Sequence, residues 1–118
     1  MRRILDIGMD KGLLRSRAAV LESAHAEVVS HYGSDLEVGE DDEFDLLVLC
    51  HSIPEKSRLS LIVDAHRRWP GVRILQISDS EFDPAPSLKY VDRVTVWGSP
   101  AQLIAAAKEL LETGGTQD

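Results

Sequence analysis

The run from Asp45 to Cys50 constrains the fold of this chain more than any other segment. Four consecutive apolar residues, Leu-Leu-Val-Leu, stand between the aspartate and the cysteine. In a strand, successive side chains point to opposite faces of the sheet. A short run in which every residue is apolar is therefore typical of a strand that is buried on both faces of a parallel sheet. Helices must then cover both faces, so the flanking sequence should alternate between strands and helices.

The rest of the chain shows this alternation. We predict strands over residues 3–7, 27–32, 45–50, 72–77 and 93–97, with helices after the first, third and fifth strands. Ser99, Pro100 and Gln102 combine an N-cap serine, a first-turn proline and a capping-box glutamine, which predicts the start of the last helix. Helices in the second and fourth connections should be short or irregular, since the former holds few apolar residues and the latter has prolines at 84 and 86. The expected fold is a three-layer α/β/α sandwich around a five-stranded parallel sheet.

The middle helix should bury one apolar stripe. Leu59, Ile62, Val63 and His66 recur at helical spacing and predict that stripe, with His66 a partly buried packing residue.

Length and charge exclude several classes of protein. The 118 residues suffice for one domain, which we place at 1–112 with a flexible tail at 113–118. A net charge of -7 opposes nucleic-acid binding. The single cysteine excludes an intrachain disulfide, and no apolar run approaches the roughly 20 residues that span a bilayer. These features favour a cytoplasmic protein with no membrane association.

An ordered set of features resembles the receiver (CheY-like) domain of bacterial two-component response regulators. The set comprises the order of elements, the approach at 44–49 to the third strand, Pro54 four residues after Cys50, and the helix start at 99–103. The resemblance extends from about residue 3 to 112. It implies a flavodoxin-like topology with the strand order 2-1-3-4-5.

The same resemblance indicates that the family's phosphorylation chemistry is lost. The acidic pair falls on Gly8 and Met9, which leaves Asp10 as the only carboxylate of that turn, and the phosphoacceptor position holds Cys50. Active receivers also carry a Thr or Ser after the fourth strand, and a lysine and an aromatic switch residue at the fifth. The resemblance places Ser78, Val96 and Arg93, respectively, at these positions. Mg²⁺ needs oxygen ligands that most of these residues lack, so we expect no metal, no cofactor and no catalytic residue. A shifted register, with a two-residue insertion, would instead put Asp6 at the acidic position.

The expected function is therefore that of a non-phosphorylated pseudo-receiver, which is not an enzyme and which signals by binding a protein partner, a homodimer being one option. The candidate interface residues, near the fifth strand, are Phe82, Tyr90, Arg93 and Trp97. Each of them could equally pack in the core.

Two alternatives stay open. The first is a redox switch or small enzyme that uses Cys50, although free cysteines are often buried apolar residues. A phosphatase-type loop from Cys50 is disfavoured, because Lys56 stands where arginine would grip phosphate. His51 should point away from Cys50, as neighbouring strand residues do, and with Asp10 could bind a soft metal. The second alternative is a divergent receiver phosphorylated at Ser78 or Asp10.

Overall fold

The structure is a computed structural model that describes residues 2–36, 42–78, 86–96 and 99–113. Its elements are, in order, strand β1 Arg2–Gly8, helix α1 Lys11–Glu22, strand β2 Ala26–Tyr32, strand β3 Leu46–Leu49, helix α2 Glu55–Arg68, strand β4 Arg73–Ser78, 3₁₀ helix η1 Pro86–Tyr90, strand β5 Arg93–Val96 and helix α3 Pro100–Thr113. No helix in the described part of the chain is both long and apolar enough to cross a membrane.

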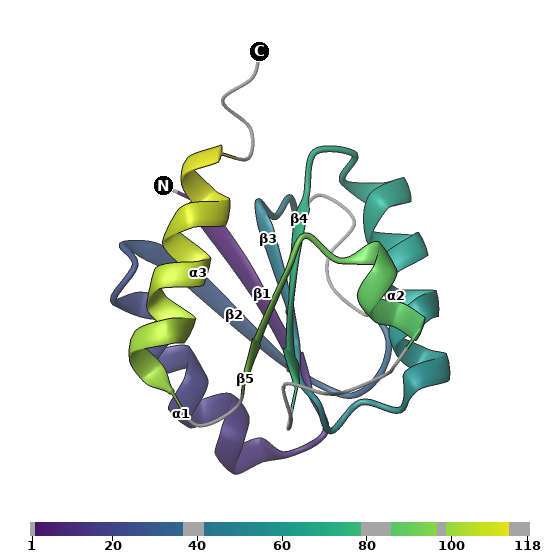
Figure 1. Cartoon of the computed structure of the whole chain (residues 1–118), viewed down its shortest axis with the longest axis horizontal. Helices are drawn as coiled ribbons and strands as arrows, with labels where there is room; N and C mark the ends of the chain where they lie inside the picture. Colours follow the sequence, from purple (N-terminus) through teal and green to yellow (C-terminus); the bar gives the residue numbers. More distant parts are fainter. Residues whose placement is uncertain (1, 37–41, 79–85, 97–98, 114–118) are drawn as a thin grey trace.

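All five strands lie parallel in one sheet in the order β2-β1-β3-β4-β5, which confirms the predicted topology. Strand β1 pairs with two neighbours, so that Ile4 lies opposite Val28 on one side and Leu46 on the other. Helices α1 and α3 cover one face of the sheet, and α2 with η1 covers the other (Figure 1). The strand order reverses between β1 and β3, which is where doubly wound sheets bind their ligands.

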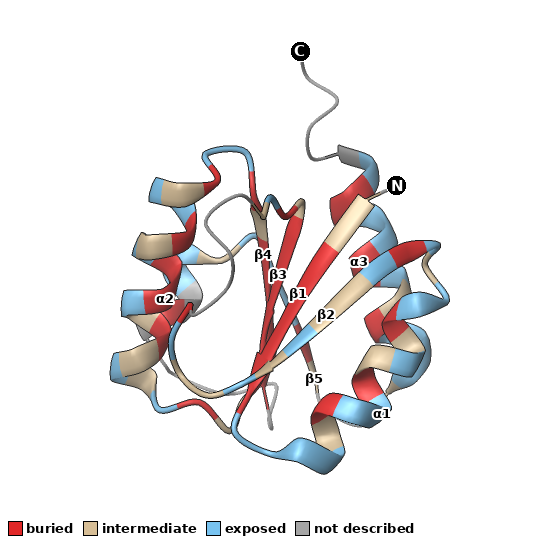
Figure 2. Ribbon diagram, turned by 180° about the vertical axis from the view of Figure 1, so that it is seen from behind, coloured by how far each residue is buried: buried red, intermediate tan, exposed pale blue. Residues whose placement is uncertain are grey.

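Burial along the strands follows their place in the sheet (Figure 2). All four residues of β3 are fully buried, because neighbouring strands flank it and helices cover both of its faces. Strand β2 forms an edge, and only its first residue, Ala26, is buried. The unbroken apolar run therefore marks the centre of the sheet, as the sequence predicts.

Consecutive strand residues supply two separate apolar cores. Leu47 and Leu49 pack on the α2 side with Trp69, whereas Leu46 and Val48 pack on the side of α1 and α3. This division follows from the two-residue period of a strand. Burial of both sets accounts for the three-layer arrangement.

Two helices begin at side chains that cap them. The Oδ1 atom of Asp10 accepts a hydrogen bond from Leu13 N at 3.0 Å at the start of α1. At the start of α3, the Oγ atom of Ser99 accepts one from Gln102 N at 3.3 Å, as predicted. Each cap satisfies a backbone N–H that the first turn of a helix leaves unpaired.

The connections between β2 and β3 and between β4 and β5 are irregular in the residues that the structure describes. Between β2 and β3, residues 33–36 and 42–45 form bends and irregular chain without a helix, and the rest of that prediction lies outside the described residues. The fourth helix is reduced to η1, whose Ser87 donates from its backbone N and its hydroxyl to the carboxylate of Glu55, at 2.5 and 2.8 Å. This carboxylate fixes η1 against α2.

The predicted buried face of α2 is partly wrong. Its buried residues are Arg58, Leu61, Ile62 and Ala65. Val63 is 66% exposed, and His66 is exposed rather than partly buried. The buried face is displaced by one residue from the predicted stripe, because Leu61 and Ala65 pack in the core beside Ile62. Arg58 lies on the same face and pairs with Glu55, at 3.2 Å.

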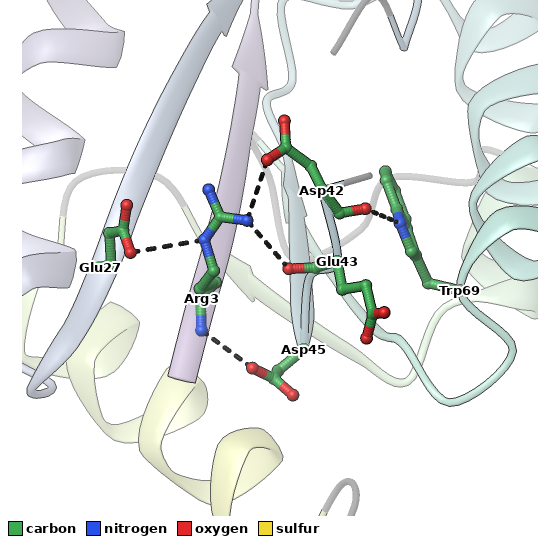
Figure 3. Close-up of polar contacts among 6 residues, drawn as sticks. All are labelled: Arg3, Glu27, Asp42, Glu43, Asp45 and Trp69. Carbon is green, nitrogen blue, oxygen red and sulfur yellow. Dashed lines mark hydrogen bonds and ion pairs between the residues drawn. The ribbon is translucent and has the colours of Figure 1, made fainter. Parts of the chain in front are cut away.

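Polar contacts around Arg3 link the ends where the strands begin (Figure 3). Its guanidinium forms ion pairs with Glu27 of β2, at 3.4 Å, and with Asp42, at 3.2 Å. It also lies 4.7 Å from the centre of the Phe44 ring, which meets Trp69 edge to face. The Trp69 indole N–H in turn donates to the backbone oxygen of Asp42 at 2.7 Å. We call these residues, Arg3, Glu27, Asp42, Phe44 and Trp69, the Arg3 cluster.

Candidate functional site

The opposite edge of the sheet, where the strands end, holds the residues that the sequence singles out. Gly8 ends β1, Cys50 directly follows β3, and Ser78 ends β4. Val96 ends β5 and lies opposite Ser78 in the register. The topology thus brings the predicted site positions to one edge, and we call this edge the carboxyl edge.

Gly8 and Cys50 approach each other closely at this edge. A Cβ atom placed on Gly8 would lie 3.0 Å from the Cβ atom of Cys50, which is closer than ordinary van der Waals contact. The backbone of Cys50 is tied to β1 by a hydrogen bond from its N–H to the Ile7 carbonyl, at 3.1 Å. A side chain at position 8 would therefore require the Cys50 side chain or the ends of β1 and β3 to move by a few tenths of an ångström.

The Cys50 thiol is fully buried within a short chain of polar contacts. The Ser52 hydroxyl lies 3.2 Å from Sγ, and Ser52 Oγ also accepts a hydrogen bond from Met9 N at 2.9 Å. His51 Nδ1 lies 3.8 Å from Sγ. The prediction that His51 points away from Cys50 is wrong, because β3 ends at Leu49 and the histidine lies in a turn, where strand alternation no longer applies.

Asp10 is exposed, and its carboxylate already caps α1 through Leu13 N. Ser78 is fully buried. Neither Gly8, Met9, Cys50 nor Val96 carries a carboxylate, and Mg²⁺ prefers carboxylate and other oxygen ligands. The donors at these positions therefore do not fit Mg²⁺. Within the described ranges, no three His, Cys, Asp or Glu side chains are placed to hold a metal.

A buried ion pair lies beneath this edge. Asp6 is fully buried and Arg17 is 5% exposed, and Arg17 Nε lies 3.2 Å from Asp6 Oδ1. Burial raises the pKa of the Asp6 carboxyl to about 6, although the adjacent Arg17 charge and its hydrogen bond oppose this rise. Asp6 lies within β1, opposite Val48, so it does not take the acidic position of the shifted register.

The sequence contains an indication of this ion pair that lies outside the receiver-like motif positions. Leu14, Arg17 and Leu21 are the buried residues of α1, so a charged residue stands in the apolar stripe of the helix. A charge in such a stripe requires a buried partner. Asp6, the only charged residue among the apolar residues of its strand from 4 to 7, is that partner.

The predicted interface residues are only partly described. Tyr90 is 60% exposed, and Arg93 is exposed and forms an ion pair with Glu109 of α3. Phe82 and Trp97 lie outside the described residues. The neighbouring Val94, on edge strand β5, is 40% exposed. His25 and His31 lie on separate segments, and His31 pairs with Asp35 at 2.8 Å.

No family model and no curated protein matches the sequence, but solved structures do match the fold. A CheY-like response regulator receiver domain protein from Methanospirillum hungatei JF-1 is 23% identical, with 95% of this chain and 94% of that chain covered and a TM-score of 0.76. A response regulator from Thermotoga maritima, solved in complex with Mg²⁺-BeF, is 18% identical, with coverage of 93% and 99% and a TM-score of 0.79.

A third similar structure has a different description. It is a putative pilus assembly-related protein from Burkholderia pseudomallei K96243, 21% identical, with coverage of 100% and 95% and a TM-score of 0.80. At these identities the similarity establishes the fold. The chain has the α/β fold of CheY-like receiver domains, as the sequence predicts.

Proposed function

We propose that this chain is a receiver-like signalling module that is not phosphorylated, is not an enzyme, and acts by binding another protein in a bacterial two-component-type system. The observation that carries the proposal is the close approach of Gly8 to the side chain of Cys50. By the resemblance, the matching positions of a phosphorylated receiver hold an acidic residue and the phosphoacceptor aspartate. Here one position has no side chain and the other has a buried thiol.

The remaining groups at the carboxyl edge support the same proposal. Transfer of a phosphoryl group to an aspartate depends on a metal ion and a lysine that offset the developing charge. Val96 stands at the lysine position, and Asp10 caps α1 instead of facing an aspartate. Ser78 is fully buried, which disfavours it as an acceptor.

The exposed apolar side chains near β5 support a protein partner. Tyr90 and Val94 are 60% and 40% exposed, and β5 is the edge strand of the sheet, with one neighbouring strand among the described residues. Exposed apolar surface next to a strand edge is typical of protein interfaces. We include Phe82 and Trp97 in this interface, and either another protein or a second copy of the chain would bind there.

Other parts of the proposal rest on composition and on the sequence pattern. The net charge of -7 disfavours nucleic acid, and we propose a cytoplasmic location. Residues 1–112 would form the domain and 113–118 a tail. The pilus-related structure supports a receiver fold in proteins that are not described as response regulators.

The test is an amide-resolved NMR titration with Mg²⁺ and beryllofluoride, a phosphate mimic. The Thermotoga response regulator, whose structure holds this mimic, is the positive control. We expect saturable shifts in that control and none around Gly8, Cys50 and Ser78 of this chain. Saturable shifts at these residues that spread to β5 would refute the proposal.

Two further measurements separate the alternatives. Intact-mass analysis after incubation with acetyl phosphate should show no added phosphate, and a phosphate on Ser78 or Asp10 would identify a divergent active receiver. The Cys50 thiol should react slowly with a thiol reagent in the folded protein, because it is fully buried. Fast reaction that the Ser52→Ala variant alters would instead favour a redox role.

A further inference from the structure

Strand β2 forms a long edge of the sheet, with β1 as its one neighbouring strand in the described part of the chain. It has 7 residues, whereas the opposite edge strand, β5, has 4. In Figure 2 the sheet runs between α2 on one side and α1 with α3 on the other, and no helix lies across β2. The chain after β2 forms no helix over residues 33–36 or 42–45. A long strand edge of this kind can pair with a strand of another chain.

The hydrogen bonds to β1 show which backbone groups of β2 point outwards. Gly33 N, directly after the strand, donates to the Gly8 carbonyl of β1 at 2.9 Å. Successive residues of a pleated strand turn their N–H and C=O groups to opposite sides, so every second residue of β2 points away from β1. These outward residues are Ala26, Val28, Ser30 and Tyr32. No hydrogen bond from another described segment reaches their backbone groups.

This arrangement allows β2 to pair with the β2 of a second copy in an antiparallel, two-fold symmetric way. Hydrogen-bonded pairs form between residues whose backbone groups both point outwards. With Val29 on the two-fold axis, Val28 of each copy lies opposite Ser30 of the other. Ala26 then lies opposite Tyr32. Each outward residue of the strand therefore has an outward residue as its partner.

The same register brings opposite charges together. Glu27 of each copy lies opposite His31 of the other, in a non-hydrogen-bonded pair, where facing side chains are closest. Their side chains are 54% and 21% exposed. Within one copy Glu27 pairs with Arg3 and His31 with Asp35, so the contact extends both ion pairs into a row of alternating charge. A shift by two residues would put Val29 opposite Glu27 or His31 and remove this match.

We propose that β2 pairs with the β2 of a second copy in this register, which joins the two sheets into one. A second copy fits because the edge is complementary to itself: outward backbone groups and charges match about the same axis. The surface lies at the opposite edge of the sheet from β5. The inference therefore depends neither on the interface proposed near β5 nor on the state of the carboxyl edge.

The first experiment is sedimentation equilibrium of the full chain at about pH 6, where histidine side chains are partly protonated. We expect a reversible dimer to form between micromolar and low millimolar concentration. A chain that stays monomeric over this range would overturn the proposal.

Ser30→Pro tests the backbone pairing. Its lost N–H points away from β1, and proline is tolerated at such positions of an edge strand, so the monomer should stay folded. The dimer should weaken at least about tenfold, because each copy loses a donor to the other. Ser30→Ala keeps the N–H and is the matched control, with unchanged affinity. Unchanged affinity in folded Ser30→Pro, with folding checked by the amide NMR spectrum, would overturn the proposal.

A charge exchange tests the register. His31→Glu places two carboxylates opposite each other and should weaken the dimer at least about fivefold. Addition of Glu27→His should restore the affinity, since opposite charges then face each other again across the axis. A double variant as weak as the single one would overturn the register.

The last comparison separates the two edges of the sheet. Val94→Lys, on β5, should leave the dimer intact. Dissociation by Val94→Lys but not by Ser30→Pro would place the contact between copies at β5, and would overturn the proposal while supporting the interface near that strand.

Discussion

Two arginines mark the contrast between the edges of the sheet. Arg3, where the strands begin, has a side chain that is 27% exposed and contacts Glu27, Asp42 and Phe44. Arg17, beneath the edge where the strands end, is almost fully buried, and its one ion pair among the described residues is with Asp6, through Nε. The first is part of a network that joins several segments. The second is a charge held away from water, and its Nη2 amino group has no hydrogen-bond partner in the described part of the chain.

The contrast indicates that the two edges contribute differently to stability. Partly exposed ion pairs and aromatic contacts stabilise modestly and carry little desolvation cost. A buried pair with unsatisfied atoms gives little net stability, because the cost of desolvation offsets the attraction between the charges. The predictions below test this division, from the largest expected effect to the smallest.

Trp69→Ala should have the largest effect on stability. The indole is 6% exposed, packs against Phe44 and donates to the Asp42 backbone. Its loss should lower the free energy of unfolding by about 3–5 kcal/mol, measured by urea denaturation. Cys50→Ala at the carboxyl edge should cost only about 1 kcal/mol. Similar losses at the two positions would contradict the division.

The buried Asp6 should make stability depend on pH in an unusual direction. Because its pKa is raised to about 6 in the folded state, from an ordinary value of 3.8, the folded protein binds more protons between these pH values. Its contribution to stability is therefore greatest below about pH 4 and falls as the pH rises to about 6. Over this window the loss amounts to about 3 kcal/mol at most.

Asp6→Asn should abolish this contribution. Urea denaturation from pH 4 to 7 should show the stability of the variant rising relative to the wild type as the pH increases. The change of this difference with pH is the test, because loss of the charge also alters Arg17. A constant difference would mean that Asp6 has an ordinary pKa, and would remove the cost assigned to the buried pair.

Arg3→Leu should lower the free energy of unfolding by about 1–2 kcal/mol, since it removes two ion pairs and a cation–π contact. Arg15→Leu is the matched control: Arg15 is exposed on α1, and its replacement should change stability by less than about 0.5 kcal/mol. Equal effects of the two substitutions, by urea denaturation, would show that the Arg3 cluster contributes nothing.

Asp10→Ala should have the smallest effect, a loss of about 1 kcal/mol from removal of the α1 cap. Asp10→Asn retains a capping oxygen and should restore most of this loss. Neither variant should change the response to Mg²⁺, followed by NMR. A Mg²⁺ response in the wild type that both variants abolish would make Asp10 a ligand rather than a cap.

Local patterns predicted the parts of the fold that depend on local chemistry. The four apolar residues before Cys50 identified the central strand, and Ser99 with Pro100 identified the start of α3. The orientation of α2 could not be obtained in this way. Ile62 and Val63 are both apolar, and which of them faces the core depends on how the whole helix packs on the sheet, where Leu61, Ile62 and Ala65 are buried and Val63 is exposed.

The candidate site divides in the same manner. Motif spacing placed Gly8, Cys50, Ser78 and Val96 at one edge, because parallel strands all end on the same side of a sheet. The approach of His51 to Cys50 depends on where β3 ends, and the buried pair of Asp6 with Arg17 depends on how α1 packs on the sheet. Both are properties of tertiary packing, although Arg17 in the apolar stripe of α1 was a usable signal for the pair.

The contact between Gly8 and Cys50 also bears on how an acidic side chain could be introduced at position 8. Every residue except glycine has a Cβ atom, so any such side chain would meet residue 50 unless that residue were itself glycine. The Cys50 side chain or the ends of β1 and β3 would have to move by a few tenths of an ångström, within a closely packed core. Engineering an acidic site here is therefore a matter of backbone spacing as well as of side-chain identity.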